Sequence, residues 1–220
     1  MIKKKVSILG CGWTGNALYK KLISKYEVNC LCKDIEENDR CGFYDVDVLV
    51  IAIPAKNNYL EVLKQTLQKT YKNTYIILLS SISFYKNRTI VVDAEKLIQK
   101  ESSKYVILRL GGLMGYDRIS GKYTAGKTLD NNTVTNYVHR DDVVSVIETL
   151  TKKQIENEIF DVVAPIQSTQ KEIFSLNANR FGFEKTSFLD DNPIGKKISS
   201  LPLIEKTGYK FKKNNVLDFW

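Results

Sequence analysis

The sequence Val6-Ser7-Ile8-Leu9-Gly10-Cys11-Gly12-Trp13-Thr14-Gly15 places three glycines directly after a short apolar run. Such a run, when it ends in glycine, is typical of a buried strand. Leu18, Leu22 and Ile23 then fall at helical spacing, which predicts a helix over residues 13–25. The glycines therefore lie between the first strand and the first helix of the chain.

The same alternation of strand and helix continues to about residue 112. Further short apolar runs, each expected to form a strand, lie at residues 27–32, 46–53, 75–79 and 105–110. Helical spacing of apolar residues recurs at residues 59–70 and 91–100. Residues 34–45 are polar and are expected to be irregular, with at most one short strand at residues 41–44. The pattern predicts an α/β fold, a Rossmann-type doubly wound parallel sheet whose strands end at one ligand-binding edge.

The amino-acid composition of the chain changes after this predicted sheet. Residues 115–136 are rich in Gly, Thr, Asn and Asp, which predicts a long polar loop with a functional role. Asp141 is expected to cap a helix that runs to about Lys152. A strand at residues 159–163 and a helix at residues 168–181 are expected to follow.

The 220 residues carry a formal net charge of +8, which raises the question of a nucleic-acid partner. Only six of the 33 basic residues are arginine, the side chain that most often contacts bases and phosphates in pairs of hydrogen bonds. The lysines are dispersed, and the longest basic cluster is Lys3-Lys4-Lys5. We therefore expect a solvated lysine-rich surface and no nucleic-acid partner. Nucleic-acid binding is the minor alternative, and it predicts a steep salt dependence of affinity.

All four cysteines, Cys11, Cys30, Cys32 and Cys41, lie in the first fifth of the chain. They form no Cys-x-x-Cys pair, and His139 is the only histidine, so no metal site is expected. A reducing cytoplasm is the simplest explanation for these cysteines. The first apolar run is too short for a signal peptide, and no stretch approaches the ~18–20 apolar residues that cross a bilayer. A cytoplasmic protein without a membrane partner is expected.

A Gly-x-Gly-x-x-Gly motif between a first strand and a first helix indicates a site for the pyrophosphate of a dinucleotide. Gly10 allows a tight turn, Gly12 lets the backbone approach the phosphates, and Gly15 lets the helix pack closely on the strand. The helix N-terminus adds N–H donors and a partial positive charge. We expect NADP or NAD as cofactor, and a glycine-rich turn that binds no ligand is the alternative.

The expected cofactor contacts come from this loop and from the ends of neighbouring strands. They are Gly10, Cys11, Gly12, Trp13, Thr14, Gly15, Lys33, Asp34, Ala52, Ile53, Pro54 and Ser80. Asp34 has the carboxylate to bond the ribose 2′-hydroxyl of NAD, whereas Lys33 has the charge to bind the 2′-phosphate of NADP. We lean slightly to NADP, and a surface lysine is the alternative.

Four later segments resemble the motifs of one enzyme family. Residues 80–85 (Ser-Ser-Ile-Ser-Phe-Tyr) are similar to its Ser-Ser-Thr-Ser-Val-Tyr, and residues 108–118 look like its Leu-Arg-Leu-x-Gly-x-x-Gly-x-x-Arg. Residues 136–143 resemble its Asn-x-Ile-His-x-Asp-Asp-Val, and residues 195–199 with 206–209 match its tail. Over almost its full length the chain thus resembles the short-chain dehydrogenase/reductase superfamily, most of all its atypical extended, NAD-dependent epimerase/dehydratase-like branch.

In that family a tyrosine transfers the proton, a lysine four residues later lowers the pKa of that tyrosine, and a serine or threonine orients the substrate. The helix that carries this pair normally has a glutamate four residues past the lysine. Aligning that glutamate with Glu95 puts Asn87 at the tyrosine position and Val91 at the lysine position. The Tyr-x-x-x-Lys pair is therefore expected to be absent.

The remaining catalytic candidates are Ser81, Tyr85 and His139. Ser81 lies four residues before Tyr85, as the family's catalytic serine does, but Ser80, Ser81 and Ser83 are equally suited to bonding backbone groups at a strand end. Tyr85 and His139 are candidates for proton transfer. The alternatives are a packed aromatic ring for Tyr85 and a structural role for the histidine.

Arg118 is a candidate to hold an anionic or phosphorylated group of the substrate, with a surface arginine as the alternative. The resemblance implies an NAD(P)-dependent epimerase, dehydratase or reductase that acts on a sugar nucleotide or another polar carbonyl compound by an atypical mechanism. The missing pair supports the alternative of a catalytically inactive dinucleotide-binding sensor or scaffold. We expect a single NAD(P)-binding Rossmann-like domain over residues 1–220, monomeric or dimeric, with most of a reduced substrate lobe in residues 165–220.

Overall fold

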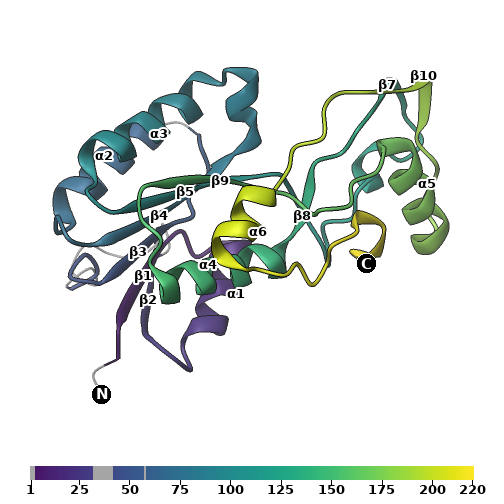
Figure 1. The fold of residues 1–220 in the computed structure, drawn as a ribbon. Helices are drawn as coiled ribbons and strands as arrows, with labels where there is room; N and C mark the ends of the chain where they lie inside the picture. The colour runs from purple at the N-terminus through teal and green to yellow at the C-terminus, as the bar shows by residue number, and fades with distance from the viewer. Residues whose placement is uncertain (1–2, 32–41, 57) are drawn as a thin grey trace. The chain divides into compact units, whose positions relative to one another are not determined.

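The computed structural model describes residues 3–31, 42–56 and 58–220 and consists of two compact units (Figure 1). Unit 1 comprises residues 1–109 and 144–160, and unit 2 comprises residues 110–143 and 161–220. Unit 2 therefore includes the predicted lobe at residues 165–220 and, in addition, residues 110–143 and 161–164. None of the helices in the described residues has the length and apolar content that crossing a membrane requires.

A six-stranded sheet with the order β2-β1-β3-β4-β5-β9 forms the centre of unit 1. Its strands are β1 (Lys5–Leu9), β2 (Glu27–Leu31), β3 (Val48–Ile51), β4 (Tyr75–Ser81), β5 (Tyr105–Leu110) and β9 (Glu158–Val162). β1 pairs in parallel with both β2 and β3, and β3 pairs in parallel with β4. The predicted α/β fold with a Rossmann-type parallel sheet is confirmed.

Helices cover both faces of this sheet (Figure 1). One face carries α2 (Tyr59–Lys69) and α3 (Thr89–Glu101), and the other carries α1 (Trp13–Leu22) and α4 (Arg140–Lys153). All four residues of β3 are buried, as expected of a strand covered on both faces. Residues 42–44, where at most one short strand was expected, are irregular and form a turn closed by a bond from Asp45 N–H to the Gly42 carbonyl. Cys41 lies outside the described residues.

Unit 2 contains two small parallel sheets. β6 (Gly112–Met114) pairs with β8 (Tyr137–His139), and β7 (Thr128–Thr133) pairs with β10 (Ser187–Ile194). Helices α5 (Gln170–Phe181) and α6 (Leu201–Thr207) complete the unit, and Ile173, Phe174 and Phe219 belong to its apolar core.

The prediction of a long polar loop at residues 115–136 is wrong, because this segment contains the short helix η3 (Lys122–Thr124) and β7. β7 reads Thr-Leu-Asp-Asn-Asn-Thr; its one apolar residue, Leu129, is partly buried against the core, and its buried residue is Asn132. A strand with a single apolar residue lacks the alternation by which strands are recognised in a sequence.

The start of α4 also differs from the prediction. The helix begins at Arg140, so Asp141 is its second residue and not its cap. The backbone N–H of Asp141 instead donates to Nδ1 of His139 at 3.2 Å. An imidazole nitrogen thus takes the part that a serine or aspartate oxygen usually plays at a helix start. The predicted helix at residues 168–181 is confirmed from Gln170 onward, and the side chain of Thr169 caps it.

Candidate functional site

The glycine loop joins β1 to α1 beside the position where the strand order of the sheet reverses. Gly10 has a φ of +111°, and a Cβ there would lie 2.8 Å from the Ala52 carbonyl carbon. A Cβ at Gly15 would lie 1.9 Å from the Gly10 carbonyl oxygen, whereas one at Gly12 would meet no atom within 4 Å. Two glycines therefore fold the loop tightly, and the third leaves open space over the backbone, as a bound pyrophosphate requires.

The N-terminus of α1 has no capping side chain. Gly12 is the N-cap residue and has no side chain that could cap the helix. The first turn contains no acidic residue. The first N–H groups of a helix have no partner within the helix, and phosphate oxygens are typical ligands of such a helix start. Cys11, Trp13 and Thr14 lie in the loop or in this first turn. The loop as a whole fits the pyrophosphate of a dinucleotide.

The other expected cofactor contacts lie at the same edge of the sheet, with two exceptions. Ala52 follows β3, and its N–H donates to the Leu9 carbonyl at 2.8 Å. Ile53, Pro54 and Ser80 line one cavity of about 190 Å³. The exceptions are Lys33 and Asp34, which lie outside the described residues, so the choice between NAD and NADP stays a prediction.

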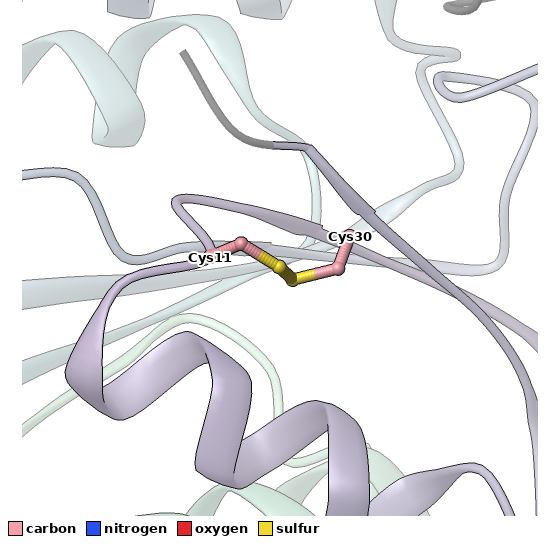
Figure 2. The surroundings of a disulfide bond; sticks show 2 residues. All are labelled: Cys11 and Cys30. Carbon is pink, nitrogen blue, oxygen red and sulfur yellow. A yellow bond between two sulfur atoms is a disulfide. The ribbon is translucent and has the colours of Figure 1, made fainter. Parts of the chain in front are cut away.

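A disulfide bond attaches the glycine loop to β2 (Figure 2). It joins Cys11 to Cys30, whose Cα atoms are 5.7 Å apart. The N–H of Gly10 also donates to the Leu31 carbonyl at 3.1 Å, so the loop is held to β2 twice. The interpretation of the cysteines by a reducing cytoplasm did not foresee this bond, because spacing in a sequence does not reveal pairing. Cys32 lies outside the described residues.

A buried ion pair supports the end of β4. Glu95 of α3 is 1% exposed and accepts hydrogen bonds from Nε and Nη2 of Arg109 at 2.8–3.1 Å. It also accepts the hydroxyl of Ser80 at 2.5 Å. The Arg109 guanidinium lies 3.5 Å from the ring centroid of Phe84 and donates to the Tyr85 hydroxyl at 3.3 Å. Burial lowers the pKa of Arg109, but the bonds to Glu95 and Tyr85 outweigh it and raise the pKa, so the side chain stays charged.

Ser81 and Tyr85 both lie near this ion pair. Ser81 Oγ accepts the N–H of Ser83 at 3.1 Å, so Ser81 does bond backbone at the strand end, as one interpretation of the sequence has it. That bond uses a lone pair, and within the described residues no acceptor takes the Ser81 hydroxyl proton. Tyr85 is 52% exposed, with its hydroxyl beside the Arg109 guanidinium. Ser81 therefore retains a donor for a ligand, and Tyr85 has both solvent access and a neighbouring positive charge.

Asn87 and Val91, the positions assigned to the missing pair, lie in different environments. Asn87 has a φ of +52° and precedes α3, which begins at Thr89. Val91 lies inside α3, is 3% exposed, and lines the cavity beside Ser81. A tyrosine at position 87 would therefore not stand on a helix one turn before residue 91. The correspondence of these positions to the family's pair stays a prediction.

His139 and Arg118 belong to unit 2, whereas Ser81 and Tyr85 belong to unit 1. His139 is 3% exposed, and its ring lies between Tyr116 and Phe219 at centroid distances of 5.4 Å. Burial lowers the pKa of His139, which keeps it neutral and able to accept the Asp141 N–H. These contacts match the structural role considered for the histidine, and its catalytic role stays a prediction.

Arg118 lines a separate cavity of about 510 Å³ within unit 2. Three aromatic residues, Tyr123, Tyr137 and Phe174, line the same cavity. Tyr137 receives a hydrogen bond from Ser120 at 3.1 Å, and Tyr123 is 79% exposed. A guanidinium among aromatic faces can hold a planar ring together with an anionic group.

No protein-family model matches the sequence. The protein YeeZ of Escherichia coli K12 is 24% identical to it, over 95% of this chain and 96% of that protein. The UDP-N-acetylglucosamine 4-epimerase of Bacillus cereus superimposes with a TM-score of 0.75 at 15% identity, over 96% of this chain and 95% of its own. The chain has the Rossmann-like fold of this epimerase.

Two further neighbours were solved with a cofactor bound. MoeE5, in complex with UDP-glucose and NAD, has a TM-score of 0.75 at 11% identity, covering 98% of this chain and 95% of its own. RMD from Pseudomonas aeruginosa, in complex with NADPH, has a TM-score of 0.71 at 14% identity, covering 98% and 97%. At these identities the likeness establishes the fold alone.

Two polar residues that line the cavity beside Ser81 were not foreseen from the sequence. Arg88, the N-cap residue of α3, and Tyr59, the first residue of α2, both line it. Neither belongs to a motif, and only the folded chain brings them to Ser81. Arg109 was quoted within a motif without a role, and the signal available was its position two residues before the glycines that follow β5.

Proposed function

We propose that this chain binds a nicotinamide dinucleotide over residues 10–15 and uses it as an epimerase, dehydratase or reductase on a sugar nucleotide or another polar carbonyl compound. The observation that carries the proposal is the geometry of the glycine loop, with a closed Gly10 and Gly15 and an open Gly12. The NAD and NADPH complexes of proteins with the same fold support a nicotinamide cofactor. Lys33 favours NADP, and equal affinity for NADH and NADPH would contradict that preference.

A bound nicotinamide supplies the acceptor or donor of a hydride. Ser81 orients the substrate oxygen with the hydroxyl proton that it has available. When a carbinol gives its hydride to the bound nicotinamide, its hydroxyl proton would pass to Tyr85 in the phenolate form. In the reverse reaction the Tyr85 hydroxyl would donate that proton to the carbonyl oxygen. Arg109 supplies positive charge beside the Tyr85 hydroxyl, and Glu95 holds Arg109 in place.

Arg118 is proposed to hold the phosphorylated end of the substrate. Its cavity in unit 2 also contains aromatic side chains that suit a nucleobase. The bound UDP-glucose of MoeE5 supports a sugar nucleotide as the substrate class.

The test is turnover of NAD(P)H with carbonyl sugar nucleotides by the purified chain and by Ser81→Ala combined with Tyr85→Phe. We expect the double variant to lose at least about a hundredfold in kcat, the usual loss when proton transfer is removed. Ser24→Ala combined with Tyr71→Phe, which makes the same chemical changes at exposed positions, is expected to retain activity. Unchanged turnover in the Ser81 and Tyr85 variant contradicts the assigned roles.

The second candidate is a dinucleotide-binding sensor or scaffold without catalysis. It is favoured by Asn87, which precedes α3 in a left-handed conformation, and by the apolar Val91. Such a protein binds the dinucleotide without turnover. At a hundred times the dissociation constant the ligand is then expected to raise the free energy of unfolding by about 2.7 kcal/mol. A robust substrate would exclude this candidate.

A further inference from the structure

Two cavities of unit 1 share one wall at the carboxyl edge of the sheet. The smaller, of about 190 Å³, is lined by Ser80 and Ser81, and the larger, of about 670 Å³, has Lys56 in its wall. Tyr59 and Arg88 line both. At about 30 Å³ for each water, the smaller cavity has the volume of roughly six water molecules. It has room for a small polar group and the carbon that bears it.

The polar side chains of the smaller cavity are hydrogen-bond donors. Ser81 retains its hydroxyl proton, and Arg88 has N–H groups only. Burial, followed by the negative charge of Glu95, raises the pKa of Tyr59 to about 12, so its hydroxyl is protonated at neutral pH. Ser80 already donates to Glu95. Within the described residues no carboxylate lines this cavity, so its side chains suit an anion.

Arg88 is held in position without being neutralised. Its Nη2 donates to the Ala55 carbonyl at 2.9 Å, which leaves the other guanidinium N–H groups available. Arg109, by contrast, is bonded through two nitrogens to Glu95. Over the described ranges of the chain, Arg88 pairs with no carboxylate. Arg88 is an exposed side chain that lines both cavities, and its remaining N–H groups are available to an anion there.

We infer that Arg88 binds a carboxylate of the substrate and so directs the neighbouring reacting carbon toward Ser81. The planar guanidinium matches a planar carboxylate with two parallel hydrogen bonds, which fixes orientation as well as charge. The substrate is thus an anionic carbonyl or carbinol compound, such as a nucleotide sugar that carries a carboxylate on the sugar. This inference rests on the proposed function, because it places the reacting carbon beside Ser81.

The test compares two probes that differ at one carbon, UDP-glucuronate and UDP-glucose. Their dissociation constants are measured by calorimetry with the chain saturated with NAD⁺ or NADP⁺, whichever binds more tightly. We expect UDP-glucuronate to bind at least tenfold more tightly to the wild-type chain. In Arg88→Ala and in Arg88→Gln this preference is expected to fall below twofold, and in Arg88→Lys to fall only in part.

Three controls keep the result interpretable. Lys86→Ala removes a nearby exposed cation that lines neither cavity, and it is expected to leave the preference unchanged. Arg88→Gln retains an N–H donor for the Ala55 carbonyl, so it covers the case in which Arg88→Ala does not fold. The affinity for the dinucleotide is measured for every variant. If the Arg88 variants lose dinucleotide affinity as much as they lose affinity for UDP-glucuronate, Arg88 binds the cofactor and the inference is overturned.

The inference is also overturned if the wild-type chain does not distinguish the two probes, binds neither of them, or keeps its preference without Arg88. If the dinucleotide binds normally in those cases, the dinucleotide-binding part of the proposed function survives. If the wild-type chain binds no dinucleotide, the proposed function itself fails.

Discussion

The glycine loop at residues 10–15 and the segment at residues 81–91 both follow strands of one sheet, but they are built differently. In the loop, backbone atoms set the structure, because a Cβ at Gly10 or Gly15 would overlap other backbone. In the later segment, side chains set it, through the bonds of Glu95 and Arg109. A site formed by backbone atoms accepts few residue types at its positions. A site formed by side chains can also be assembled from residues in other parts of the chain. Three experiments test this contrast, and a fourth tests the role of His139 at the start of α4.

The largest expected effect is in the side-chain region. Arg109→Ala leaves Glu95 as a buried charge without a partner, which destabilises a protein by about 3–5 kcal/mol. Urea unfolding measures this loss. Lys104→Ala breaks the more exposed pair with Glu156 and is expected to cost no more than about 1 kcal/mol. Equal effects of the two substitutions would show that side chains do not hold this region together.

The next effect concerns how the loop is held to β2. The Cys11–Cys30 bond joins cysteines that are 19 residues apart and so restricts the unfolded chain. Its reduction removes this restriction and is expected to lower the free energy of unfolding by about 3 kcal/mol. Urea unfolding with and without dithiothreitol measures it. The variant with Cys32→Ser and Cys41→Ser is expected to lose stability on addition of dithiothreitol as the wild-type chain does. The variant with Cys11→Ser and Cys30→Ser is expected to have the same stability with and without dithiothreitol. A response that persists in the second pair would assign the bond to other cysteines.

A smaller effect separates folding from binding within the glycine loop. In Gly12→Ala the new Cβ meets no protein atom, so the melting temperature without ligand is expected to stay unchanged. Dinucleotide affinity is expected to fall at least tenfold, about 1.4 kcal/mol, because the methyl group occupies the approach to the phosphates. Gly15→Ala is expected to lower the melting temperature as well. Full affinity in Gly12→Ala would place the cofactor elsewhere.

The smallest effect is the pH dependence that His139 gives to stability. Its pKa is lowered by burial and by Lys213 and Arg140, against the opposing charges of Asp141 and Asp142. In the unfolded chain its pKa returns to about 6.5, so the unfolded state binds more protons below that pH. The free energy of unfolding therefore falls as the pH drops from about 6.5 toward the lowered pKa. His139→Gln is expected to flatten this slope, and an unchanged slope would assign it to other groups.

The sheet and the glycine loop were predictable from the sequence because both depend on local patterns. The short, mostly apolar run Val6–Leu9 before Gly10, and the buried run Val48–Ile51, mark strands by composition alone. Unit 2 was less predictable, since β7 is polar and acquires its structure only by pairing with β10, more than fifty residues away. The role of His139 at the start of α4 was hidden for a similar reason, because imidazole is not a usual cap.

The candidate site was predictable only in its cofactor half. Gly10, Gly12 and Gly15 form a motif with fixed spacing, so their positions could be read directly. Arg88 and Tyr59 lie far apart in the sequence and meet at one cavity because α2 and α3 pack side by side on the same face. No spacing rule connects them.

The order in which the chain visits the two units affects how it is synthesised. The chain leaves unit 1 after Arg109, returns at Val144 and leaves again after Phe160. β5 is therefore complete some fifty residues before its partner β9 emerges from the ribosome. During that interval β5 is the edge of a growing sheet, with unpaired backbone groups that invite contact with other chains. Neither unit is a continuous segment of the chain, so neither can be expressed alone from one uninterrupted stretch of the gene.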